Sequence, residues 1–117
     1  MGARLSRLLI SSTSRLIYQS SAQDFARRHV GSGGRAYQFL MLYQPPGSPF
    51  GAAHVVDLPL LLGIPASWAA TPLLSQATWT EVNATGRQVR QLWADFVRTG
   101  VLPAWVAIAN VLRVQRV

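Results

Sequence analysis

Residues 36–43 read Ala-Tyr-Gln-Phe-Leu-Met-Leu-Tyr, and residues 51–59 read Gly-Ala-Ala-His-Val-Val-Asp-Leu-Pro. The first stretch is too continuously apolar for a half-exposed strand, which predicts a strand buried on both faces. Three prolines at positions 45, 46 and 49 then break the strand into a loop. His54 follows on a turn of small residues. Open α/β folds assemble their sites on loops at the carboxyl ends of parallel strands, so this placement suits a catalytic histidine.

A helix is expected before this strand. Ser20 or Ser21 can cap it, with Gln23 or Asp24 completing a capping box. Its apolar residues share one face at helical spacing; they are Ala22, Phe25, Ala26 and Val30. Arg27, Arg28 and His29 crowd the last turn, where the helix dipole favours cations, and Gly31 is expected to end the helix in a left-handed cap.

A second helix is expected after the strand and the turn-rich residues 63–72. It runs from about Thr80 to Thr99, and Gly100 with Pro103 stops it. Its expected buried stripe consists of Val82, Gly86, Val89, Trp93, Phe96 and Val97. The order of elements is therefore helix, strand, histidine loop and helix, which is an α/β arrangement whose sheet is incomplete.

Composition narrows the classes of protein. A chain of 117 residues with 50% hydrophobic and 13% charged residues fits one small domain or a piece of a larger one. The net charge of +7 comes from eleven arginines spread along the chain, so nucleic acid is not the favoured partner. No cysteine is present, which excludes thiol catalysis and thiolate metal sites. The longest apolar run, Val55 to Ala66, is shorter than the about 20 residues that a transmembrane helix needs.

The N-terminal segment permits two interpretations. Residues 1–23 hold three arginines, six serines and no acidic residue, which is the composition of an organellar transit peptide. The stretch Ser12 to Tyr18, followed by Phe25 and Ala26, instead resembles a helix-entry segment that precedes the histidine strand in bacterial carboxylesterases, although aspartate is common there in place of Ser14.

Other candidate sites have structural explanations. His29 is most simply a cation at a helix C-terminus. The run Gly31-Ser32-Gly33-Gly34 joins a helix to a strand, the reverse of the order that a phosphate loop needs. Two histidines 25 residues apart without clustered carboxylates indicate no metal site, and no cofactor is indicated. The sequon Asn83-Ala84-Thr85 falls within an expected helix.

Five landmarks carry a family resemblance over residues 12–105. They are the aromatic strand Tyr37–Tyr43, the turn Gly51–His54, Asp57 with Leu58, the stretch Leu60–Gly63, and the series Trp93, Phe96, Gly100, Pro103 and Trp105. In this order and spacing the chain resembles the C-terminal part of type-B carboxylesterases, the para-nitrobenzyl-esterase-like members of the α/β-hydrolase superfamily. The family usually has Gly where this chain has Val55, and Pro where it has Val106. Residues 1–11 form a basic segment, and residues 106–117 a divergent tail.

The resemblance implies a serine esterase in which His54 is the general base and acid. No Gly-x-Ser-x-Gly occurs in these 117 residues, so the nucleophile and the triad acid are expected outside them or missing. Asp57 is given a structural role, because the family places its acid upstream. A small-molecule ester would be a substrate only if an N-terminal part supplied the serine and the acid, and the isolated chain is expected to be inactive.

Two alternatives remain. One is a non-catalytic binding or interaction protein derived from the hydrolase segment, and the other is a basic organellar or nucleic-acid-associated protein. A cytoplasmic location is favoured without a specific signal for it.

Overall fold

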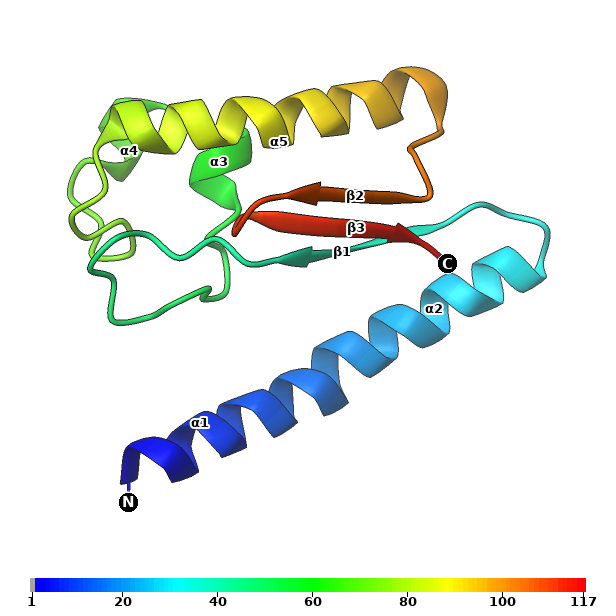
Figure 1. Cartoon of the computed structure of the whole chain (residues 1–117), viewed down its shortest axis with the longest axis horizontal. Coiled ribbons are helices and arrows are strands. Elements are labelled where there is room, and N and C mark those ends of the chain that lie inside the picture. The colour runs from blue at the N-terminus through cyan, green and yellow to red at the C-terminus, as the bar shows by residue number, and fades with distance from the viewer. Residues whose placement is uncertain (1) are drawn as a thin grey trace. The chain divides into compact units, whose positions relative to one another are not determined.

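A computed structural model describes residues 2–117 (Figure 1). The chain divides into two compact units, one made of the residues up to Gln38 together with Arg116–Val117, and the other of Phe39–Gln115. Each unit is described by itself.

The first unit is dominated by a helical segment longer than the predicted one. It consists of α1 (Gly2–Thr13), the π-helix η1 (Ser14–Gln19) and α2 (Ser20–Gly31). The prediction of a helix start at Ser20 or Ser21 is therefore wrong. Because the preceding residues are already helical, the Ser20 N–H donates to the Arg15 carbonyl oxygen, and the Ser20 hydroxyl donates to the same oxygen at 2.8 Å.

The end of α2 agrees with the expected basic last turn but not with the expected cap. Arg28 and His29 occupy the last turn, as predicted. The left-handed residue is Gly33, with φ of 86°, and not Gly31. A Cβ on Gly34 would lie 2.2 Å from the His29 Nε2, so the imidazole packs against the backbone at Gly34 and would have to move for a larger residue. His29 thus has a structural explanation in the packing of this turn.

Three strands form one sheet in the order β1-β3-β2, with β1 at Tyr37–Met41, β2 at Trp105–Ile108 and β3 at Leu112–Arg116. β2 and β3 are antiparallel, with Trp105 opposite Gln115. β1 is antiparallel to β3 as well (Figure 1), since hydrogen bonds join Val117 to Ala36 at one end and Leu42 to Val111 at the other. The rule about parallel strands therefore does not apply within this sheet.

The position of β1 corrects the prediction of a strand buried on both faces. β1 lies at an edge of the sheet and pairs only with β3. Consequently Phe39 is 45% exposed and Leu40, which points to the other face, is 44% exposed. The strand has the expected apolar residues, but among the described residues it pairs with one strand only.

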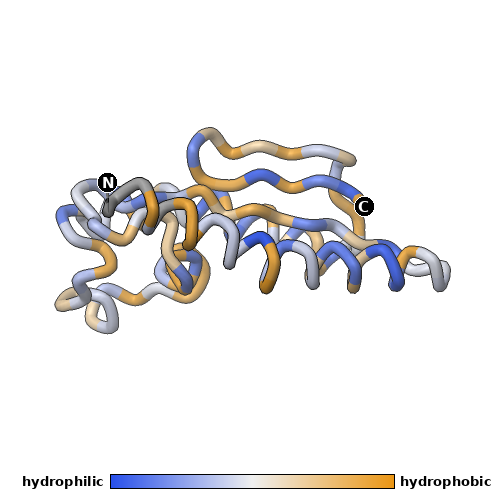
Figure 2. The backbone as a smooth tube through the Cα atoms, turned by 90° about the horizontal axis from the view of Figure 1, so that it is seen from below, coloured by the Kyte–Doolittle hydropathy of each residue, from blue (hydrophilic) through white to orange (hydrophobic). Residues whose placement is uncertain are grey.

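The hairpin of β2 and β3 was not predicted, because residues 106–117 matched no pattern. In its tight connection the Val111 N–H donates to the Ile108 carbonyl oxygen at 3.0 Å, and Asn110 takes a positive φ of 55°, which asparagine tolerates. Figure 2 shows the alternation of apolar and polar residues along β3 toward the C-terminus. Leu112 and Val114 are the buried members of that alternation.

The second predicted helix is confirmed as α5 (Trp79–Thr99). Its N-terminus has a capping box, in which the Glu81 N–H donates to the Thr78 hydroxyl and the Thr78 N–H donates to the Glu81 carboxylate at 2.8 Å. Gly100, with φ of 66°, ends the helix as predicted, and its N–H donates to the Phe96 carbonyl oxygen.

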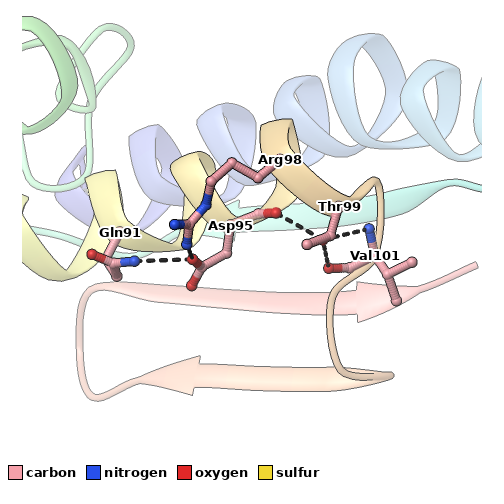
Figure 3. A network of polar contacts seen from close by, with 5 residues as sticks. All are labelled: Gln91, Asp95, Arg98, Thr99 and Val101. Carbon is pink, nitrogen blue, oxygen red and sulfur yellow. Dashed lines mark hydrogen bonds and ion pairs between the residues drawn. The ribbon is translucent and has the colours of Figure 1, made fainter.

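Polar contacts also hold the last turn of α5 (Figure 3). Gln91 Nε2 donates to the Asp95 carboxylate at 2.9 Å, and Arg98 forms an ion pair with the same oxygen. The Thr99 hydroxyl lies 2.8 Å from the Asp95 carbonyl oxygen and accepts from the Val101 N–H at 3.2 Å. The Asp95 side chain thus links Gln91 and Arg98 on one face of the helix, and the Thr99 hydroxyl links the helix to the residue that follows its cap.

The core of the second unit lies where α3 (Leu58–Leu62) packs on the first half of α5. Leu60 is fully buried there, and the buried residues of α5 are Val82, Gly86 and Val89. The stripe is buried only in this half, because α3 is short. Phe96 is 42% and Val97 80% exposed, which corrects the prediction for those two residues.

Candidate functional site

His54 lies on a turn between the loop that follows β1 and the start of α3, and its side chain is exposed. Two residues with positive φ flank it, Gly51 at 63° and Val55 at 66°. The turn is closed by the Val56 N–H, which donates to the Ala53 carbonyl oxygen at 3.2 Å. This geometry presents the imidazole to solvent from a sharply bent backbone.

Val55 is the unusual residue of the turn. A β-branched side chain at positive φ is a genuine outlier, since Cβ then approaches the backbone too closely. Glycine adopts such a φ without a steric penalty, whereas valine does not. The departure noted in the sequence thus coincides with a strained residue directly beside the candidate catalytic histidine, and such strain is often found at functional sites.

The strained turn is anchored on its C-terminal side. Val56 is 1% exposed, and the fully buried Leu60 follows in α3. The carbonyl oxygen of Asp57 accepts hydrogen bonds from the N–H groups of Leu60 and Leu61, at 3.1 and 3.0 Å. Asp57 therefore begins α3 through its main chain, while its side chain makes no capping hydrogen bond.

The loop before His54 is held by a segment that lies far ahead in the sequence. The Gln76 N–H donates to the Pro46 carbonyl oxygen at 3.3 Å, and the Ser75 hydroxyl donates to the Gly47 carbonyl oxygen at 3.1 Å. A Cβ on Gly47 would meet the Gln76 side chain at 2.8 Å. The loop before the histidine turn and the helix α3 after it are thus both held by contacts within the second unit.

Tyr43 is buried just after β1, at the start of this loop. Burial raises the pKa of its phenol, and the negative charge of Glu81 raises it further. The phenol therefore keeps its proton at neutral pH and contributes no base to the site.

Arg90 is a positioning feature that the sequence analysis missed. One guanidinium nitrogen donates to the Leu60 carbonyl oxygen at 2.7 Å, and another donates to the Asn83 Oδ1 at 2.8 Å. The side chain thereby ties the end of α3 to α5, and α3 in turn carries the His54 turn. No sequence signal pointed to it, because the two ends of this contact are 30 residues apart.

Within residues 2–117, no serine hydroxyl or carboxylate is hydrogen-bonded to the His54 imidazole. The same part of the chain holds no group of three or more histidine, aspartate or glutamate residues that could bind a metal ion. The site consists of a positioned imidazole, the one component of a hydrolytic triad that the sequence analysis identified.

Comparison with known proteins finds one similar hydrolase. The chain is 30% identical over 106 residues to a probable N-octanoylanthranilate hydrolase of Rhodococcus erythropolis. The match covers 89% of this chain but only 23% of the relative, so the chain spans about a quarter of that protein's length. No family model and no solved structure matches the chain.

At a coarse level, therefore, the chain is related to a hydrolase. Its fold is a small mixed domain of helices and a three-stranded antiparallel sheet, which is compatible with a partial α/β fold. Across the described residues, no helix has the length and apolar character needed to span a membrane.

Proposed function

We propose that this chain is the histidine-bearing part of a serine acyl hydrolase of the α/β-hydrolase superfamily, related to type-B carboxylesterases. In this proposal residues 12–105 carry the hydrolase-derived segment. His54 acts as general base and acid, and a second part of the enzyme supplies the serine and the carboxylate.

The chemistry is acyl transfer to water. The serine hydroxyl attacks the substrate carbonyl carbon while His54 takes its proton, and the tetrahedral intermediate expels the alcohol or amine, which receives that proton. Water then attacks the acyl-enzyme, again losing a proton to His54, and the released serine oxygen regains one. The carboxylate orients the imidazole and stabilises its protonated form.

One observation carries the proposal: His54 is exposed on a bent, anchored turn that follows a strand and precedes a helix. A general base must reach the proton that it removes, and an imidazole fixed at its backbone but open to solvent meets this need. The similarity to a named hydrolase over most of the chain supports the same class of function.

The name of the relative also suggests the type of substrate. N-octanoylanthranilate holds an eight-carbon acyl group on the nitrogen of an aromatic amine, so the bond hydrolysed in that protein is an amide. We propose that the complete enzyme cleaves an acyl group from an aromatic leaving group, as an ester or an anilide.

A chimera tests the proposal. The matching segment of the Rhodococcus hydrolase is replaced by this chain, and hydrolysis of N-octanoylanthranilate and of an aryl octanoate is measured. We expect hydrolysis by the chimera and a loss of about a thousandfold or more in kcat with His54→Ala. The matched control is His29→Ala, which removes the other histidine of the chain and should leave kcat unchanged.

If the full chimera is insoluble, a second chimera that carries only residues 51–63 of this chain in the Rhodococcus hydrolase is tested instead. An active chimera that is insensitive to His54→Ala would refute the role of His54. A folded full chimera and a folded second chimera that are both inactive would refute the proposed function as a whole.

A further inference from the structure

In the first unit, taken by itself, an apolar stripe of α1 is exposed. Leu5, Leu8 and Leu9 of α1 lie at helical spacing on one face, and their side chains are 61 to 65% exposed. The side chain of Leu16 in η1 is also exposed, at 73%. Burying such side chains is favourable by roughly 1.5–3 kcal/mol each in general, so a surface of this kind gains from an apolar partner.

The same segment is basic in composition. Its sequence holds arginines at positions 4, 7 and 15, of which Arg15 is exposed, and the first acidic residue of the chain is Asp24. Residues 2–19, named here the basic amphipathic helix, therefore carry three formal positive charges and no negative side chain.

This combination discriminates among partners. A second copy of the chain would bring arginines against arginines, because the helix offers no carboxylate to pair with them. A nucleic acid would use the arginines but leave the leucine stripe in water. An anionic lipid surface satisfies both features at once, with the acyl boundary taking the leucines and the headgroups taking the arginines.

The helix is suited to lie on a bilayer and not to cross it. Arginines at positions 4, 7 and 15 interrupt its apolar residues, whereas a transmembrane helix needs about 20 consecutive, predominantly apolar residues. Serines and arginines interrupt the apolar residues of the segment, as in interfacial helices, and Ile10 and Ile17, which are 67% and 56% exposed, widen its apolar surface beyond the three leucines.

We propose that the basic amphipathic helix docks on anionic lipid headgroups, with Leu5, Leu8 and Leu9 entering the acyl boundary. This inference rests on the first unit alone and is independent of the proposed catalytic function.

Co-sedimentation of the full chain with vesicles tests it. Pure phosphatidylcholine vesicles are compared with phosphatidylcholine vesicles that contain phosphatidylglycerol, at about 0.05 M and about 0.5 M salt. We expect binding to the anionic vesicles that weakens at high salt. Arg15→Gln should weaken it about fivefold, the effect of one arginine near such a surface.

Matched variants distinguish binding through the basic amphipathic helix from nonspecific hydrophobic or electrostatic binding by other parts of the chain. The double variant Leu5→Ser with Leu9→Ser should weaken vesicle binding about tenfold or more. Val97→Ser removes an equally exposed aliphatic side chain of α5, and Arg87→Gln removes an exposed arginine of the same helix; neither should change binding. Circular dichroism confirms that each variant keeps its helix content.

Several results would overturn the proposal. Equal binding to neutral and anionic vesicles would show that charge does not contribute. If Val97→Ser and Arg87→Gln weakened binding as much as the variants of the basic amphipathic helix, that helix would not be the binding site. Retention of duplex DNA with the same arginine dependence, together with absence of vesicle binding, would replace the lipid surface with nucleic acid as the partner.

Discussion

Replacing Gly86 with alanine is expected to separate α3 from α5. A Cβ at this position would lie 2.4 Å from the Leu60 carbonyl oxygen and 2.6 Å from Arg90 Nη1. The first of these atoms belongs to the backbone of α3, so it cannot rotate away and the whole short helix must move. The movement also lengthens the Arg90 to Leu60 hydrogen bond, which is now 2.7 Å.

The expected magnitude follows from three contributions. Overpacking a close contact costs about 1–3 kcal/mol, and weakening the half-buried hydrogen bond of Arg90 adds about 1 kcal/mol. Alanine offsets about 1 kcal/mol through its better helix propensity. The net loss is about 2 kcal/mol, which corresponds to an about 30-fold larger equilibrium population of the open state.

Hydrogen exchange measured by mass spectrometry reads this opening directly, in peptides covering residues 58–62 and 79–92. Gly31→Ala is the matched control, because a Cβ there meets no atom within 4 Å and the residue lies in the other unit. Exchange in these peptides should accelerate with Gly86→Ala and stay unchanged with Gly31→Ala. Unchanged or slower exchange with Gly86→Ala would show that the close approach of α3 and α5 is not a packing constraint.

Three further outcomes are expected. Val55→Gly should slow exchange in α3 about fivefold, because it relieves about 1 kcal/mol of left-handed strain, whereas Val56→Gly should accelerate it by removing a buried side chain; acceleration by Val55→Gly would contradict the strain. The hydrogen bonds from Thr78 lower the pKa of Glu81 below its ordinary value of 4.5, so the capping box should stabilise the start of α5 fully above pH 4.5 and progressively less as pH falls below that value. Hydrogen exchange at the start of α5 should show this pH dependence, and Glu81→Gln should abolish it. If the pH dependence persists in the variant, another group causes it. The isolated chain should show no saturable hydrolysis of a short-chain aryl ester, and hydrolysis that His54→Ala removes would contradict this expectation.

The helix α5 shows what local sequence can predict. Its apolar residues at helical spacing and the final Gly100 are local features, so the pattern predicted the helix to within one residue, whereas the capping box of Thr78 and Glu81 was not predicted. The prediction of the start of the first helix was wrong because it considered the capping residue alone. Ser20 is a good capping residue, but the residues before it are helical too, and a continuing helix leaves no free donors to cap.

The histidine site was predicted in part. The small residues before His54 and the apolar helix after it are local features, and the structure has an exposed histidine on a turn before α3. The positive φ of Val55 could not be predicted from the residue type, because a β-branched residue disfavours that conformation and only its buried neighbours hold it there.

By itself, the sequence determined local elements of this protein: the apolar strand, the helix ending at Gly100, the basic N-terminal segment and the histidine turn. Tertiary structure alone decided that β1 pairs with β3 and lies at the edge of the sheet, and that Arg90 holds α3 to α5. The physical reason is that local patterns express interactions between residues a few positions apart. Strand order, edge exposure and the Arg90 contact depend on pairs separated by 30 or more positions, whose meeting no single segment specifies.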